Sequence, residues 1–291
     1  MAFLPTTRRN FIRLAAAAGV AAIAVDSALI EPNRPRIVRR EITLRRWPAR
    51  LDGFTIALLS DFHYDRYFSE HPLHAAVKMV NGLHPDLIVL TGDFVSVPLF
   101  SDNQEGDHKA AFAAEPCARL LWQMQAPHGL WAVLGNHDYY TDANVVTDVL
   151  RSQGIQVLAN QSVPIEAGGA RFWLAGVGDA IARTANLDAT LQSVPDEATI
   201  LLAHEPDYAD HVAQYPVDLQ LSGHSHGGQV RVPFMGPLYL PEMARKYVWG
   251  LYTVGRLTLY TNPGLGTVGV PVRWNCPPEI TLLSLRRAAG G

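Results

Sequence analysis

The chain has 291 residues, of which 48% are hydrophobic and 18% are charged. This composition excludes a disordered protein and is typical of one globular domain of generous size. The formal net charge is −3, and because residues 1–28 carry +2 (Arg8, Arg9 and Arg13 against Asp26), the remainder carries −5. A mildly acidic body argues against nucleic acid as the main partner, since phosphate backbones bind basic surfaces.

The N-terminal segment, residues 1–28, combines a charged start with an apolar run. Arg8 and Arg9 precede the alanine-rich stretch Leu14–Val25, which resembles a twin-arginine export signal. A basic amphipathic first helix is disfavoured because the run has no polar face. The run has 12 residues before Asp26, and a membrane span needs about 20. We expect twin-arginine export and a periplasmic, extracytoplasmic or membrane-associated protein, with an uncleaved anchor as the alternative to cleavage. The two candidate cleavage sites follow small residues, Ala24 and Ala28.

A basic segment, residues 29–53, comes next. Seven arginines lie between Arg34 and Arg50, against the single acid Glu41. Such a segment either lies on anionic lipid headgroups or forms a charged edge strand. The strand would include two short apolar stretches, Ile37–Val38 and Ile42–Leu44. We favour the edge strand.

Five apolar runs that read as buried strands end in Asp, His or Asn. Ligands gather at the carboxyl ends of the strands in an α/β sheet, so these ends are expected to converge on one cleft. Asp61 and His63 are two residues apart, and they point the same way if strand conformation persists; the same holds for His224 and His226. The runs and the polar residues that follow them are 56–60 before Asp61 and His63, 87–90 before Asp93, 129–134 before Asn136, His137 and Asp138, 199–202 before His204, and 217–221 before His224 and His226.

The intervening segments are read as structural elements or loops. Helices are expected at residues 72–82, 110–125 and 142–152, and strands near Val157 and at 171–175, 229–232, 257–261 and 280–285. The irregular stretch 94–115 follows a strand end, where substrate selection is commonly built. The turn Gly176–Asp179 either lines the cleft or is structural, and Asp179 is given no metal.

Two further features are left with alternatives. The loop Pro233–Tyr252 mixes apolar side chains with Arg245 and Lys246, and it either meets a lipid and its phosphate or is a hairpin tip packed on the core. Cys117 and Cys276 are either free core thiols or one disulfide.

The order D-x-H, G-D, G-N-H-D, a lone His and G-H-x-H resembles the calcineurin-like metallophosphoesterases over about residues 54–285. The resemblance implies an α/β fold in which two mixed sheets are flanked by helices, a four-layer α/β/β/α sandwich, in a domain covering residues 54–287. It also implies a metal-dependent phosphoesterase. The Asp-Arg pair of the protein-phosphatase branch is absent from Gly92–Pro98, which argues against a protein phosphatase.

Carried over residue by residue, the resemblance implies a site for two ions with Asp93 as the bridge. Oxygen and nitrogen ligands without Cys suit Mn, Fe or Zn. Hydroxide held between the ions would attack phosphorus, and His137 would point away from the metals and act as a general acid toward the leaving oxygen. Either Asp138 or Asp65 is predicted to orient His137. The ligands would be Asp61, His63, Asp93 and His226 for one ion, and Asp93, Asn136, His204 and His224 for the other.

Within the family, the twin-arginine start and the run Ser222–Gln229 look most like an exported or membrane-associated bacterial subgroup. That likeness implies hydrolysis of a phosphodiester or pyrophosphate bond in a small phosphorylated or lipid-phosphate substrate, such as UDP-2,3-diacylglucosamine in lipid A synthesis, with a membrane surface as a possible partner. The alternatives are a broad-specificity exported phosphomonoesterase or nuclease, and a non-catalytic metal-binding surface protein. The oligomeric state is left open.

Overall fold

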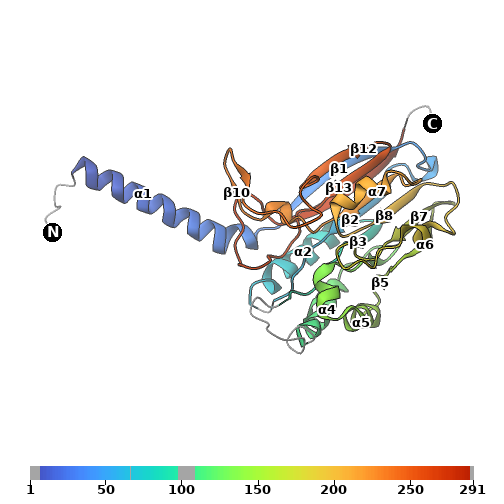
Figure 1. Ribbon diagram of the computed structural model, residues 1–291, viewed down its shortest axis with the longest axis horizontal. Helices are drawn as coiled ribbons and strands as arrows, with labels where there is room; N and C mark the ends of the chain where they lie inside the picture. Colours follow the sequence, from blue (N-terminus) through green and yellow to red (C-terminus); the bar gives the residue numbers. More distant parts are fainter. Residues whose placement is uncertain (1–6, 66, 98–108, 289–291) are drawn as a thin grey trace.

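The computed structural model describes residues 7–65, 67–97 and 109–288. Two six-stranded sheets form the centre of the molecule (Figure 1). The first sheet has the order β1-β14-β2-β3-β4-β5 and the second has the order β12-β13-β9-β8-β7-β6. The strands of the first are Arg36–Leu44, Glu279–Arg287, Thr55–Leu59, Leu87–Leu90, Leu130–Ala132 and Gln156–Val157. Those of the second are Gly250–Val254, Leu257–Thr261, Leu219–Ser222, Thr199–Leu202, Ala170–Gly176 and Gln161–Ala167.

Both sheets are mixed. In the first sheet β2 to β5 are parallel, β14 runs antiparallel to β2, and β1 is a parallel edge strand beside β14. In the second sheet β7, β8, β9 and β13 are parallel, with antiparallel edge strands on both sides. All four residues of β3, β8 and β9 are buried, as expected for strands covered on both faces.

The period of two along β2 separates two layers of the core. Ile56 and Leu58 face the second sheet, where they join Trp47, Phe172 and other apolar side chains. Ala57 and Leu59 face the helices on the other side of the first sheet. These helices are α2 (Glu70–Leu83), α4 (Ala114–Leu121) and α5 (Asn136–Ser152).

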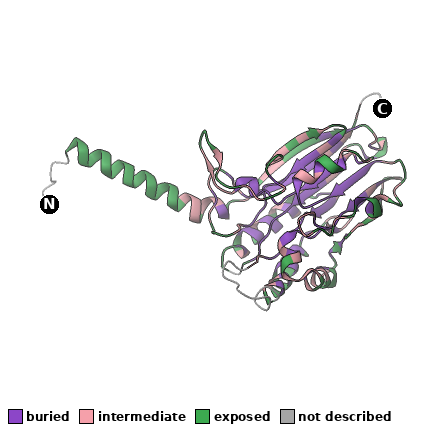
Figure 2. Ribbon diagram, viewed as in Figure 1, coloured by how far each residue is buried: buried purple, intermediate pink, exposed green. Residues whose placement is uncertain are grey.

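The outer face of the second sheet packs on the short helices α6 (Leu187–Leu191) and α7 (Ala209–Val212). The layers are therefore helices, sheet, sheet and helices, which confirms the expected α/β/β/α sandwich. Burial is concentrated in the two sheets (Figure 2).

Helix α1 (Arg8–Val25) projects from the body and buries none of its residues (Figures 1 and 2). It continues through a π-helical turn, η1 (Asp26–Ile30), and a 3-10 turn, η2 (Glu31–Asn33). The whole stretch, Arg8–Asn33, has 26 residues, a mean hydropathy of 1.7 over its most apolar part, and the length and composition of a membrane span. This helix is consistent with a signal sequence or an anchor.

Several sequence predictions are confirmed and several need correction. The basic segment does form an edge strand, β1. The predicted helix 110–125 is a 3-10 turn followed by α4, which ends at Leu121. The predicted helix 142–152 begins earlier, at Asn136, with a non-helical residue at Asp142. Strand β6 was not predicted. Half of the predicted loop 94–115, residues 98–108, lies outside the described residues, and its last part is helical rather than a loop.

Both cysteines are free and buried, so the disulfide alternative is wrong. Cys117 lies in the layer of helices, and the Cys276 thiol donates to the carbonyl of His226, 3.2 Å away.

Candidate metal centre

The five polar strand ends lie at one edge of the sandwich. The first sheet supplies Asp61 and His63 after β2, Asp93 after β3, and Asn136 and His137 after β4 at the start of α5. The second sheet supplies His204 after β8 and both His224 and His226 after β9. Since β2, β3, β4, β8 and β9 end at this edge, the predicted Asp and His side chains meet at the junction of the two sheets. They form overlapping clusters that comprise Asp61, His63, Asp93, His137, His204, His224 and His226.

The local backbone differs from the one expected. Strand β2 ends at Leu59, and Asp61 and His63 have φ values of 52° and 41°, so strand conformation does not persist between them. His224 and His226 have φ values of 65° and 49°. The period-two argument for these pairs was therefore wrong. Left-handed conformations are strained for residues with a side chain, and such strain gathers at functional sites.

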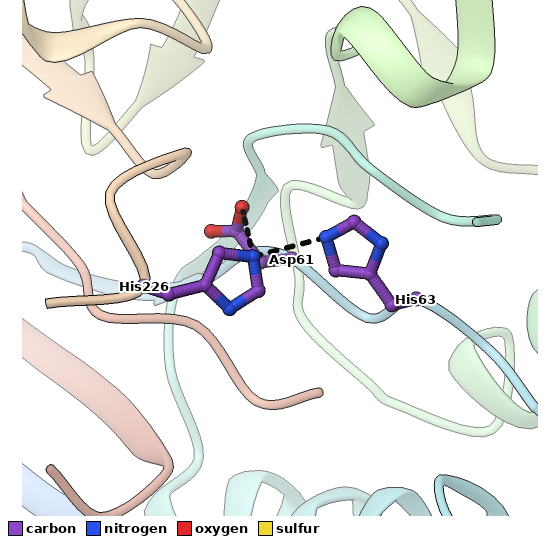
Figure 3. A group of neighbouring side chains, drawn as sticks. All are labelled: Asp61, His63 and His226. Carbon is purple, nitrogen blue, oxygen red and sulfur yellow. Dashed lines mark hydrogen bonds and ion pairs between the residues drawn. The ribbon is translucent and has the colours of Figure 1, made fainter. Parts of the chain in front are cut away.

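One cluster joins Asp61, His63 and His226 (Figure 3). The Nε2 atoms of His63 and His226 are 3.0 Å apart, and His226 Nε2 lies 3.4 Å from Asp61 Oδ1. Burial, and then the nearby His63, lower the pKa of His226 well below its usual range. A neutral imidazole is the form that binds a metal.

A second cluster joins Asp93, His204 and His224. His204 Nε2 lies 3.2 Å from Asp93 Oδ2 and 3.2 Å from His224 Nδ1. Asp93 Oδ2 is also 3.4 Å from His63 Nε2, in the first cluster. One carboxylate oxygen therefore stands between the two clusters, as a bridging ligand must.

Backbone carbonyls fix the proton positions of two of these rings. His204 Nδ1 is 2.6 Å from the carbonyl of Thr91, and His224 Nε2 is 2.8 Å from that of Glu242. A carbonyl only accepts, so both ring atoms carry their protons. In the neutral rings, His204 Nε2 and His224 Nδ1 then direct lone pairs at each other across 3.2 Å. A positive charge resolves this contact, and either a proton on His204 or a bound metal ion supplies it.

The pKa of His204 agrees with a demand for positive charge. Burial lowers it, but the carboxylates of Asp93, Asp61 and Glu205 together outweigh burial and raise the pKa well above its usual range. For Asp93, burial raises the pKa, yet His204 and His137 hold it well below its usual range. Burial raises the pKa of Asp61. The site thus pairs buried carboxylates with imidazoles and favours bound cations.

A buried polar atom without a hydrogen-bond partner also fits a metal centre. Asn136 Oδ1 has no partner, although the residue is buried at the start of α5. An orphaned amide oxygen in the interior costs free energy unless a cation or water meets it, so the donor set fits two ions that prefer oxygen and nitrogen ligands.

His137 is the partly exposed imidazole of the site. Its Nδ1 accepts a hydrogen bond from the backbone N–H of Val97 at 3.0 Å, and its ring meets that of His63 edge-on at 4.7 Å between centroids. Burial lowers the pKa of His137 to about 4. With Nδ1 engaged as an acceptor, the proton of the neutral ring is on Nε2. His137 also forms a possible ligand group with His63 and Asp93, so the structure leaves its general-acid role a prediction.

Asp138 does not orient His137, so that prediction was wrong. Its Oδ2 accepts from the N–H groups of Asp93 and Gly135, both at 2.9 Å. Its Oδ1 accepts from Phe94 and Val95 at 2.8 and 3.2 Å. Burial, and then Asp93, raise the pKa of Asp138 to about 7. The residue ties the start of α5 to the turn that carries Asp93.

Asp65 is not the orienting residue either, because its carboxylate accepts from the N–H groups of Tyr67 and Phe68 in an exposed turn. The orienting donor, the N–H of Val97, is a backbone group that side-chain reasoning does not find. The hydroxyl of Ser96, which lies 3.0 Å from His63 Nδ1, was missed as well. Its place three residues after Asp93 is the signal that was available.

The turn after β7 adds no ligand to the metal centre. Asp179 is fully buried, belongs to none of the three clusters of possible metal ligands found among the described residues, and packs against Glu205. Burial, and then Glu205, raise the pKa of Asp179 to about 9. The two carboxyl groups cap the turn by accepting backbone N–H groups from Ala180, Ile181 and Ala182.

Close packing at the site explains two glycines. A Cβ at Gly135 would lie 2.3 Å from Asp93 Oδ1 and 2.7 Å from His204 Nε2. A Cβ at Gly223 would lie 2.5 Å from Asp61 Oδ2. Gly223 thus lets the backbone approach the site closely, whereas Gly228 faces Pro237 and not the ligands.

Comparison with known proteins agrees with a metal centre at this site. The profile described as "Calcineurin-like phosphoesterase" matches residues 54–228. The chain belongs to this family. It is a metal-dependent phosphoesterase by family, and its His and Asp clusters are typical of the two-metal site of this family.

Three relatives extend over most of the chain. The phosphodiesterase YaeI of Escherichia coli is 33% identical, over 96% of this chain and 99% of its own length. A metallophosphoesterase of Bacillus subtilis, YkuE, is 35% identical over 88% of this chain and 87% of its own length. The UDP-2,3-diacylglucosamine pyrophosphatase LpxG of Chlamydia trachomatis is 28% identical over 87% of this chain and 90% of its own length. Among solved structures, the calcineurin-like phosphoesterase YfkN of Bacillus subtilis is similar at 14% identity, with a TM-score of 0.47, over 74% of this chain and 82% of that one.

Proposed function

We propose that this phosphoesterase hydrolyses a phosphodiester or pyrophosphate bond at a centre of two Mn, Fe or Zn ions. The observation that carries the proposal is the position of the buried Asp93 Oδ2 between the two clusters, 3.4 Å from His63 Nε2 and 3.2 Å from His204 Nε2. The first ion would be held by Asp61, His63, Asp93 and His226. The second would be held by Asp93, Asn136, His204 and His224.

The residues around the ligands support this division. Asp93 Oδ1 accepts the backbone N–H of His137 at 2.9 Å, which leaves Oδ2 directed between the clusters. Asp61 accepts the backbone N–H of His224 through both oxygens at 3.0 Å, and so joins the two sheets at the site. When bound, two ions supply a nucleophile from water and neutralise phosphoryl oxygens.

His137 is proposed as the group that donates a proton or a hydrogen bond to the leaving oxygen. The N–H of Val97 engages Nδ1, so the neutral ring carries its hydrogen on Nε2, which can donate a hydrogen bond to that oxygen. The partial exposure of His137 beside buried ligands suits a residue that meets substrate.

A lipid-linked or nucleotide-sugar substrate, such as UDP-2,3-diacylglucosamine, is the finer part of the proposal. Its support is the family relation to a phosphodiesterase and a UDP-2,3-diacylglucosamine pyrophosphatase, together with an exposed apolar helix at the N-terminus. We also propose twin-arginine export, on the basis of Arg8, Arg9 and that helix.

The test is a panel assay of purified, metal-loaded protein on a phosphomonoester, a phosphodiester and a nucleotide-diphospho-lipid. The proposal predicts faster turnover of the diester or the pyrophosphate than of the monoester. A monoester hydrolysed fastest would favour the broad-specificity phosphomonoesterase, and no turnover of any substrate would favour a non-catalytic metal-binding protein.

A further inference from the structure

The hairpin formed by β10 (Arg231–Val232) and β11 (Gly236–Pro237) exposes a continuous apolar tip. Phe234 is fully exposed, Met235 is 78% exposed, and the two residues after β11, Leu238 and Tyr239, are 63% and 72% exposed. The alternative of a hairpin tip packed on the core is therefore wrong for these residues, although later in the same loop Ala244 is buried and Tyr247 and Tyr252 pack against the core of the second sheet. Contiguous exposed apolar surface of this kind marks an interaction site.

The hairpin and the end of the N-terminal helix are both hydrogen-bonded to the same short segment, residues 273–276. Asn275 donates its backbone N–H to Glu31 in η2, and its side chain donates to the carbonyl of Arg231 in β10, both at 3.1 Å. Arg231 in turn donates its N–H to Trp274, and Arg273 donates its N–H to Ser27, both at 2.8 Å. Residues 273–276 thus hold both elements, which project from the same end of the body (Figure 1).

That end of the body carries an apolar helix long enough to cross a bilayer. At 1.5 Å per residue the 26 residues of Arg8–Asn33 extend about 39 Å, against about 30 Å of hydrocarbon. Exposed apolar side chains also surround the base of the helix, where Leu29, Tyr67 and Phe68 line one depression with Pro271.

The charges suit a lipid surface. From Gln229 to Tyr239 the sequence contains one cation, Arg231, and no acid. Aromatic side chains such as Phe234 and Tyr239 favour the headgroup boundary of a bilayer. Lys246 plays no part in this surface, because its ammonium group pairs with Asp210 at 2.7 Å.

We propose that the β10–β11 hairpin is a second membrane contact, which inserts Phe234 and Met235 into the lipid surface beside helix α1. The occupant is a bilayer, because the hairpin is fixed to the end of an unburied apolar helix. The hairpin is also continuous with the metal centre: His226 lies five residues before Arg231, and the carbonyl of Glu242, just after the hairpin, meets His224. The contact therefore sets the orientation of the metal centre toward the membrane.

The test uses the full chain in vesicles of phosphatidylethanolamine and phosphatidylglycerol. Phe234→Cys and, separately, Met235→Cys are labelled with a polarity-sensitive fluorophore, which is selective because Cys117 and Cys276 are buried. Trp122→Cys is the matched control, since Trp122 is an exposed aromatic at the C-terminal cap of α4, a helix that lies away from the hairpin in Figure 1. Flotation shows that each labelled protein is bound to vesicles.

In the bound protein we expect both hairpin labels to shift to shorter wavelength, to be quenched by doxyl lipids and to be several-fold less accessible to iodide, while the W122C label stays unchanged. Hairpin labels that remain as accessible to iodide as the control would overturn the proposal. So would protection that appears without lipid and rises with protein concentration, because a second copy of the chain would then cover the tip.

Discussion

Asp93 is the centre of the site because its two carboxylate oxygens have different partners. Oδ1 is occupied by the backbone N–H of His137, while Oδ2 lies 3.4 Å from His63 and 3.2 Å from His204. A carboxylate can bridge two cations, which a neutral imidazole cannot readily do. Removing the charge at this position should therefore affect both proposed ions together.

Asp93→Asn should lower phosphodiester hydrolysis by orders of magnitude and reduce bound metal below two ions per chain, with the fold retained. Activity, metal content by mass spectrometry and circular dichroism check this outcome. The matched control is Asp196→Asn, an exposed carboxylate that pairs with Arg46. A folded D93N protein with full activity and full metal content would remove Asp93 from the site.

Replacing His137 separates its two possible roles. If His137 is the general acid, His137→Gln should slow substrates with poor alkoxide leaving groups by about 10²–10⁴-fold, and those with a p-nitrophenolate leaving group much less. Metal content should stay unchanged. Equal losses for both substrates, together with one missing ion, would instead place His137 among the ligands, as its closeness to His63 and Asp93 allows.

At the scale of elements, the site depends on the joint between the turn after β3 and the start of α5. Asp138 makes this joint through four backbone N–H groups, and it is fully buried. These hydrogen bonds fix Asp93 relative to Asn136, although the side chain of Asp138 does not enter the clusters of possible ligands.

Asp138→Asn should destabilise the fold by about 1–3 kcal/mol, because the amide nitrogen cannot accept and leaves buried N–H groups unsatisfied. Metal affinity should fall by about 10–100-fold, as for groups that position ligands. Urea unfolding and chelator competition measure the two effects. Asp65→Asn is the control, because Asp65 makes similar bonds in an exposed turn. Wild-type stability and affinity in D138N would show that the joint is unimportant.

The elements also show how far sequence can predict this structure. The strands β2, β3, β8 and β9 were found because buried parallel strands are continuous apolar runs. Strand β6 was missed because it is a half-exposed edge strand containing Pro164, which weakens the alternating pattern. The convergence of Asp61, His63, His224 and His226 was predicted, yet their left-handed backbone depends on tertiary contacts such as the bond from His224 N–H to Asp61.

At the scale of the whole molecule, the metal centre sits in a body whose N-terminal helix is entirely exposed. The length of this helix was underestimated from sequence, because the apolar run appeared to stop at Asp26, whereas the helical path continues through η1 and η2 to Asn33. Ser27 and Glu31 tie its end to the body, so the position of the helix is coupled to the fold.

The export proposal makes a prediction about the whole protein. Arg8→Lys together with Arg9→Lys should leave the enzyme in the cytoplasm, because paired arginines distinguish this signal from a general secretory one. Cell fractionation followed by immunoblotting measures the distribution. The matched control is Arg13→Lys, outside the pair. Normal amounts of the double variant beyond the cytoplasm would exclude the twin-arginine route.

The most direct measurement is metal content together with activity on one preparation of the full chain. The protein is stripped with a chelator, reloaded with Mn, Fe or Zn, and assayed on a phosphodiester after each addition. The account predicts no turnover in the stripped protein and recovery that is complete at two ions per chain. Stripped protein that hydrolyses the diester at the full rate would contradict it.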